Sequence, residues 1–347
     1  MNEMVAMVDD PRFAEHRARG PHPEQPARLS AARAGAKAAL DDDATLMIEA
    51  PHATRDLLER VHTASYLGEL DRSLEVGWGN LDADTFCSPG TREAALRAAG
   101  GAAALASALM DGRARRGVAL LRPPGHHAEA DRAMGFCLLN NVAVAAEAAI
   151  AAGAERVAIV DWDVHHGNGT QHAFEDRADV LFVSLHQFPF YPGTGPATDI
   201  GKGAGTGHTL NIAFPGACGD AAYGEAFRRA VLPALRSHRP DIVLVSAGYD
   251  AHAQDPLASM ELSTEAYGAM TTAIVDVAEA LGHGRVGFLL EGGYDLQALE
   301  ASVHATLRAA QGERVALPEG RPRAAAADAI EAAVRAHERA HTNKGDR

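Results

Sequence analysis

Short runs of apolar and β-branched residues alternate along the chain with Ala-rich stretches of helical pattern. The apolar runs predict five buried strands, at residues 117–121, 156–160, 180–185, 241–247 and 285–290. The Ala-rich stretches predict helices over 91–111, 140–153, 221–237 and 264–282. This alternation predicts an α/β fold, with one domain built on a mostly parallel central sheet that has helices on both faces.

Two segments depart from the alternation. The Gly-rich stretch 193–209 predicts one long functional loop. From about residue 311 the chain becomes polar, which predicts a surface helix with a frayed end. No fixed-period repeat interrupts the pattern, so we expect a single domain.

Polar, titratable or aromatic residues follow each of the five predicted strands. The five segments are, in chain order, RPPGHHAEA, DWDVHHGNG, HQFPFYPGTG, GYDAHAQDP and EGGYDL. Ligands of open parallel sheets bind beyond the carboxyl ends of the strands. We therefore expect these five segments to line one site.

The segment DWDVHH predicts a metal site. In an extended chain Asp161, Asp163 and His165 point to the same side. Two carboxylates and an imidazole are typical ligands of Zn²⁺, Fe²⁺ or Mn²⁺, and Asp250 after another strand offers one more. Three ligands leave a position open for water and substrate, so we expect Asp161 to support the ligands from behind.

Three further side chains are candidates for proton transfer and charge stabilisation. His126 and His127 could serve as a general base and its electrostatic partner, one of them activating a water and later protonating the leaving group. Asp161 and Asn168 are candidate partners that would set their tautomers. Tyr294 could donate a hydrogen bond to a developing oxyanion.

Composition narrows the class of protein. The chain has 347 residues, 47% of them hydrophobic, which is enough for a large core without a disulfide or a structural metal. Its cysteines, Cys87, Cys137 and Cys218, are far apart and form no CxxC pattern. The N-terminus lacks the order of a signal peptide and no apolar run reaches about 18 residues, so we expect a cytoplasmic protein that does not span a membrane.

The formal charge of −14 also bears on partners. It argues against nucleic-acid binding, which needs a basic surface, and it favours the approach of cationic ligands. A homo-oligomer is compatible with the sequence, which shows no interface.

Five long motifs resemble those of one family. They are RPPGHHA with MGFCLLNN, DWDVHHGNGTQ, SLHQFPFYPGTG, SAGYDAHAQDP and LEGGYDL. Together they resemble the zinc-dependent histone deacetylase superfamily, in particular its class II branch and the bacterial histone deacetylase-like amidohydrolases and acetylpolyamine amidohydrolases. The resemblance runs from about 22–29 to residue 310, which is nearly the whole chain.

This resemblance implies the arginase/deacetylase fold, one catalytic Zn²⁺ and hydrolysis of an acetyl amide on a cationic amine. Residues 1–310 would form the deacetylase domain, and 311–347 a polar helix and tail of the same domain. Asp163, His165 and Asp250 would bind zinc. His126 would pair with Asp161, and His127, near Asn168, would be the general base and acid. Tyr294 would polarise the acetyl carbonyl.

The resemblance also implies substrate and potassium residues. The substrate tunnel would be lined by Gly135, Phe136, Phe190, Tyr191 and Gly293. A potassium ion near the zinc would be held, mainly through carbonyl groups, by Asp161, Asp163, His165, Ser184 and Leu185. A second, outer potassium would lie at Phe174, Arg177, Val180 and His208. Asn168 and Glu291 differ from the class I pattern and agree with class II.

Alternatives remain open at this point. The same fold also serves ureohydrolases with two manganese ions, and a module could bind acyl amines without turning them over. Acetyl-lysine, acetylpolyamines and other N-acyl amines all suit one metal site. Glu69, Asp82 and Asp84 could form an acidic rim for a cationic substrate.

Overall fold

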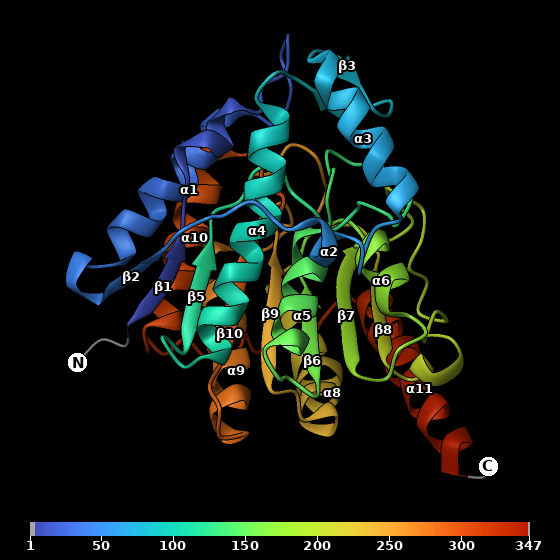
Figure 1. Cartoon of the computed structure of the whole chain (residues 1–347). Coiled ribbons are helices and arrows are strands. Elements are labelled where there is room, and N and C mark those ends of the chain that lie inside the picture. The colour runs from blue at the N-terminus through green and yellow to red at the C-terminus, as the bar shows by residue number, and fades with distance from the viewer. Residues whose placement is uncertain (1–3, 346–347) are drawn as a thin grey trace.

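An eight-stranded sheet forms the centre of the molecule (Figure 1). The structure is a computed structural model and describes residues 4–345. The strand order is β2-β1-β5-β10-β9-β6-β7-β8, and all neighbouring pairs are parallel. The strands are β1 (Val5–Val8), β2 (Thr45–Ile48), β5 (Arg116–Ala119), β6 (Val157–Asp161), β7 (Val180–Gln187), β8 (Thr209–Phe214), β9 (Ile242–Ala247) and β10 (Val286–Leu290). A separate antiparallel pair joins β3 (Gly79–Asn80) to β4 (Phe86–Cys87).

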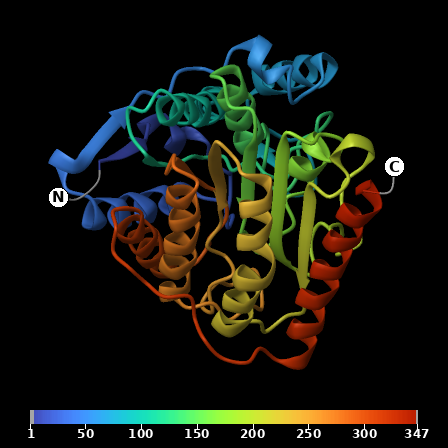
Figure 2. The ribbon, with the colours of Figure 1, turned by 90° about the horizontal axis from the view of Figure 1, so that it is seen from below.

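Helices cover both faces of this sheet (Figure 2). They are α1 (Pro26–Ala39), α2 (Arg55–Leu58), α3 (Ala64–Val76), α4 (Thr91–Met110), α5 (Asn141–Ala151), α6 (Asn168–Phe174), α7 (Asp220–Ala226), α8 (Leu232–His238), α9 (Thr264–Ala280), α10 (Leu296–Ala310) and α11 (Ala324–Gly345). Within residues 4–345, no helix has the length and apolar character needed to cross a membrane. The predicted α/β fold, with one domain and a parallel sheet between helices, is confirmed.

All five predicted strands are present, because each is an apolar run buried on both faces of a parallel sheet. The strands β1, β2 and β8 were not predicted. The first two are only four residues long, and β8 begins at the last residue of the Gly-rich stretch 193–209. The rest of that stretch is loop apart from one 3₁₀ turn at Gly203–Gly205.

The helix predicted over 221–237 is not regular. It consists of α7, a π-helical segment at Phe227–Val231, and α8. Pro233 lies in the first turn of α8, where it has no N–H to donate and its ring would clash with the carbonyl of Arg229 in an α-helix. Widening of the preceding turn avoids this clash.

The polar C-terminal segment becomes helical only at Ala324, because Pro318 and Pro322 interrupt it beforehand. Helix α11 packs along β8, and it buries Ala326, Ile330 and Ala333 there. It therefore covers the edge of the sheet with one face. The predicted frayed end falls partly on residues 346 and 347, which lie outside the described residues, and the division at residue 310 stays a prediction.

Candidate active site

The carboxyl ends of four neighbouring strands place the predicted motifs side by side. In the order β5-β10-β9-β6, these strands lead into the His126–His127 loop, the Gly292–Tyr294 turn, Asp250, and the Asp163–His165 bend. Parallel strands present all their carboxyl ends at one edge of a sheet. Segments up to about 170 residues apart in sequence thus meet at one place.

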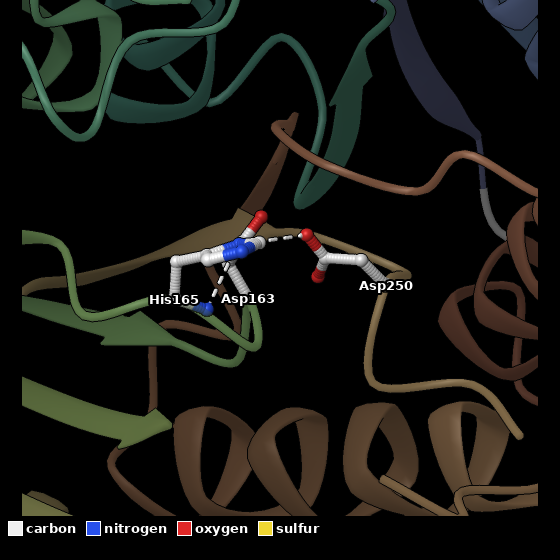
Figure 3. A group of neighbouring side chains, drawn as sticks. All are labelled: Asp163, His165 and Asp250. Atoms are coloured by element: carbon white, nitrogen blue, oxygen red, sulfur yellow. Dashed lines mark hydrogen bonds and ion pairs between the residues drawn. The ribbon is translucent and has the colours of Figure 1, made fainter. Parts of the chain in front are cut away.

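Asp163, His165 and Asp250 offer ligand atoms that all lie within 4.8 Å of one another (Figure 3). One carboxylate oxygen of each aspartate is held by a backbone N–H: Gly292 N donates to Asp163 Oδ2 at 2.8 Å, and Val164 N to Asp250 Oδ1 at 2.9 Å. The other oxygens face His165 Nδ1, at 3.1 Å from Asp163 Oδ1 and 3.2 Å from Asp250 Oδ2. The backbone therefore fixes the orientation of both carboxylates.

The charges of Asp163, His165 and Asp250 favour the binding of a cation. Burial alone would lower the pKa of His165, but its hydrogen bonds to Asp163 and Asp250 outweigh burial and raise it to about 10. A proton on this imidazole thus balances two buried carboxylates. A divalent ion of the Zn²⁺ type, bound by the same oxygen and nitrogen atoms, would supply the positive charge that these residues attract.

Asp161 is turned away from the three ligands. Strand β6 ends at this residue, so the chain bends after it and does not continue the strict alternation expected from the sequence. Its Oδ1 accepts the N–H of Asp163 at 3.1 Å, and its Oδ2 lies 2.9 Å from His126 Nδ1. Burial opposes a charge on His126, but the negative charges of Asp161 and Asp163 prevail and raise its pKa to about 10.

His127 has a different partner. Its Nδ1 lies 2.7 Å from Asn168 Oδ1, and the amide nitrogen of Asn168 donates to Glu129 Oε1 at 2.5 Å. Because Nδ1 must carry the proton toward the amide oxygen, Nε2 of His127 keeps its lone pair. Burial, together with the charges of His126 and His165, holds the pKa of His127 well below its usual range.

Tyr294 is held by groups on both sides of its loop. Its backbone N–H donates to Asp255 Oδ2 at 2.6 Å, and the guanidinium of Arg28 lies 4.7 Å from the centre of its ring. Glu291 accepts the backbone N–H of Gly125 at 2.7 Å and so ties this turn to the histidine loop. Burial raises the pKa of Tyr294 well above its usual range, so the hydroxyl keeps its proton.

A narrow cavity of about 90 Å³ connects these groups to the surface. Its lining consists of Asp84, Pro124, His126, His127, Gly135, Phe136, His165, Tyr191, Leu257, Gly292 and Tyr294. Two predicted tunnel residues lie just outside this lining. The ring of Phe190 stacks on His165 with their centres 5.4 Å apart, and the carbonyl of Gly293 accepts from Arg28 Nε at 2.6 Å.

Asp163 and His165 belong both to the candidate zinc ligands and to the residues predicted for the inner potassium. Asp161 in β6 pairs with Ser184 in β7, and Ser184 and Leu185 are fully buried. At the predicted outer site, the carbonyl of Phe174 accepts from Arg177 N at 3.0 Å and that of His208 accepts from Phe182 N at 2.9 Å. Each carbonyl oxygen retains a second lone pair. Both potassium sites stay predictions.

Four supporting residues were missed by the sequence analysis: Arg28, Glu129, Asp255 and Leu257. Glu129 and Asp255 lie within the quoted motifs RPPGHHAEA and GYDAHAQDP, so the strand-end pattern already contained them. Their contacts with Asn168 and Tyr294 are long-range and have no local signal. Of the proposed acidic rim, Asp84 lines the cavity, whereas Glu69 lies on α3 and accepts from Ser65.

Comparisons with known proteins agree with these features. The model of the histone deacetylase domain matches residues 22–310. The chain is 43% identical over 298 residues to histone deacetylase 15 of Arabidopsis thaliana, covering 84% of this chain and 53% of that protein. It is 47% identical over 249 residues to the histone deacetylase-like amidohydrolase of Pseudomonas aeruginosa, covering 71% of this chain and 65% of that protein.

A solved structure is similar over the whole length. The crystal structure of the HDA15 HD domain superposes with a TM-score of 0.91 at 36% identity and covers 99% of both chains. The probable deacetylase of Archaeoglobus fulgidus is 36% identical over 85% of this chain and 82% of its own length. The matched part of this chain spans 53% and 65% of the first two relatives' lengths.

Proposed function

Because the chain belongs to the histone deacetylase family, we propose that it hydrolyses the amide bond of N-acetylated amines with one zinc ion at Asp163, His165 and Asp250. One observation carries this proposal. His165, the histidine pair and Tyr294 line a single cavity at the carboxyl edge of the sheet, and the ligand atoms of Asp163 and Asp250 lie within 4.8 Å of that of His165. A zinc ion there would act as a Lewis acid on the acetyl carbonyl and would lower the pKa of a water molecule.

The two histidines have separate roles in this proposal. His127 removes a proton from the attacking water through Nε2, while Asn168 keeps Nδ1 protonated. His126 stays an imidazolium beside Asp161 and stabilises negative charge as it develops. His127 then delivers the proton to the departing amine.

Tyr294 completes the site by donating its hydroxyl hydrogen to the oxyanion. Its hydroxyl keeps that hydrogen because burial raises its pKa, and Asp255 and Arg28 hold its loop in place. Phe136 and Tyr191 leave a passage whose volume suits a slender aliphatic chain.

The substrate is a small cationic amine or an acetyl-lysine side chain in this proposal. Asp84 at the cavity favours positive charge, and the net charge of −14 acts in the same sense. The family match favours a deacetylase over the manganese ureohydrolase. Turnover decides between an enzyme and a module that only binds acyl amines.

The test is turnover of N-acetylputrescine and of an acetyl-lysine peptide, with the metal content measured on the same sample. One zinc per active site and release of acetate support the proposal. A kcat/KM more than tenfold higher for N-acetylputrescine than for the peptide would identify an acetylpolyamine deacetylase. A preference for the peptide would identify a lysine deacetylase. Zinc binding with no turnover of either substrate would favour the binding module.

The variant Tyr294→Phe tests the mechanism. Loss of one oxyanion donor should lower kcat by about 10²–10³. Tyr223→Phe is the matched control, because it removes another buried hydroxyl, one with no hydrogen-bond partner among the described residues. A kcat of Tyr294→Phe within threefold of the wild type contradicts the role of Tyr294.

A further inference from the structure

Four histidines from three segments of the chain line a second cavity, far from the active site in the fold. His208 directly precedes β8, His238 is the last residue of α8, and His337 and His341 belong to α11. All four line a cavity of about 230 Å³, together with Leu181, Gly207, Ala234 and Ser237. The cavity lies at the amino ends of strands, whereas the active site lies at their carboxyl ends. Figure 2 shows α11 along the edge strand β8.

Three of the six pairs among these rings lie close together, although no three of the four rings bring their nitrogen atoms within 4.8 Å of one another in this structure. Ring centres are 5.5 Å apart for His208 and His238, 6.3 Å for His208 and His341, and 4.5 Å for His337 and His341. A zinc–nitrogen bond of about 2 Å places each imidazole centre roughly 3 Å from the metal, so tetrahedral neighbours lie about 5 Å apart. The observed separations lie on both sides of that value.

The sequence of α11 contains a spacing that zinc sites use. Residues 337–341 read HERAH, which matches the pattern H-E-x-x-H. Two histidines four residues apart occupy one face of a helix, as in zinc metalloproteases. Here that face lies toward β8, and the ring of His341 rests on Gly207, where a Cβ atom would come within 2.5 Å of its Nδ1.

The hydrogen-bond geometry of the cluster leaves two ring nitrogens that could bind a metal ion. His238 Nε2 donates to the carbonyl of Val157 at 3.1 Å, a contact typical of metal-bound histidines, and so leaves Nδ1 as the ligand atom. Nδ1 of His337 is buried and has no hydrogen-bond partner among the described residues.

We infer that His208, His238, His337 and His341 form a second metal site, for a divalent ion that prefers imidazole ligands, such as Zn²⁺, Ni²⁺ or Cu²⁺. The site is structural, because an ion bound there joins α11 to α8 and to the start of β8. Binding requires rotation of the half-buried and exposed rings about χ1 and χ2, so that their nitrogens converge. This site uses imidazole groups, whereas the predicted outer potassium would use the carbonyl of His208.

The test measures zinc content after equilibrium dialysis of the full chain without a histidine tag. Four proteins are compared: the wild type, Asp250→Asn, His337→Gln with His341→Gln, and all three changes together. We expect about two, one, one and no zinc ions per chain, respectively. The comparison of wild type with the double glutamine variant tests the second site alone, whether or not the active-site proposal holds.

A stability measurement gives an independent readout. Zinc in excess over the active-site equivalent should raise the Tm of the wild type by about 3–4 °C at 100 times the Kd, and should leave the glutamine variant unchanged. His304→Ala is the control, because it removes an imidazole from α10, outside the cluster. Equal zinc content and equal Tm shifts in the wild type and the glutamine variant would overturn the inference, as would loss of the second zinc in His304→Ala.

Discussion

His126 and His127 are adjacent and chemically identical, yet their surroundings give them opposite properties. Asp161 beside His126 raises its pKa against the effect of burial, whereas His127 is buried beside a neutral amide and two positive neighbours, which lowers its pKa. The difference comes from the residues that contact each Nδ1. At the scale of single residues, the partner therefore decides which histidine accepts a proton.

Glu129 should matter for catalysis although it does not line the cavity. It accepts from the amide nitrogen of Asn168, and this contact keeps the amide oxygen turned toward His127. We expect Glu129→Ala to lower kcat on the order of tenfold with little change in KM, the scale found for groups that orient functional side chains. Steady-state kinetics on the proposed substrates measure both constants.

A double-mutant cycle separates this positioning role from general destabilisation. If Glu129 acts through Asn168, Glu129→Ala adds little to the loss already caused by Asn168→Ala. Glu129→Gln, which retains an amide oxygen that can accept from Asn168, should recover part of the activity. Additive losses in the cycle would contradict the role given to Glu129.

Near the active site, the uncharged ring of His62 connects several secondary-structure elements through hydrogen bonds. His62, next to the N-terminal end of α3, donates from Nδ1 to the carbonyl of Glu129 at 2.8 Å. Its Nε2 accepts the N–H of Asn140, the N-cap of α5, at 3.0 Å. Because a protonated ring cannot accept from Asn140, this link between α3, α5 and the Glu129 loop requires a neutral imidazole.

This link predicts a pH dependence of stability. Burial lowers the pKa of His62 from 6.5 to about 4, so the unfolded chain binds the proton more readily than the folded one. The contribution of His62 is therefore complete above pH 6.5, declines as the pH falls and is lost below about 4. The full difference is about 3 kcal/mol in the free energy of unfolding.

Denaturant unfolding of the wild type and of His62→Gln at pH 7.5 and 5.0 measures this contribution. Other titrating groups affect both proteins, so their effects cancel in the difference between them. The stability advantage of the wild type should shrink by about 2 kcal/mol between the two pH values. A constant or growing difference would show that His62 does not titrate as the structure indicates.

Charge acts over the whole molecule. The chain carries a net charge of −14, and Asp84 lines the cavity. Burial raises the pKa of Tyr191, and the negative charges of Asp84 and Asp82 raise it further, so both carboxylates act on the same part of the cavity. The mouth of the cavity is thus negative. A cationic substrate is attracted there by long-range forces that salt screens.

We expect Asp84→Asn to raise KM for N-acetylputrescine by about 2–5-fold at low ionic strength, because an exposed ion pair contributes up to about 1 kcal/mol. The effect should fade in high salt and be absent for a neutral N-alkyl acetamide. Glu69→Gln is the control, because Glu69 lies on α3 away from the cavity lining. An equal rise in KM for the neutral amide would contradict the charge argument.

The local sequence pattern was sufficient to predict much of the candidate site. Apolar runs followed by polar motifs predicted five of the strands, and the residue types and spacing of DWDVHH predicted Asp163 and His165 as ligands. These features are encoded by neighbouring residues, since strand burial and side-chain alternation act over a few positions. Pro233 shows the limit of this approach, because a single residue changed the middle of a predicted helix.

The sequence by itself determined the fold class and the chemical types available to the site. Only the tertiary structure decided which groups meet. The strand order β5-β10-β9-β6 brings Asp250 next to Asp163, the backbone N–H of Gly292 orients that carboxylate, and Glu129 contacts Asn168. The four histidines around α11 likewise come from three distant segments. Such pairings depend on distances through space, and no local pattern carries them.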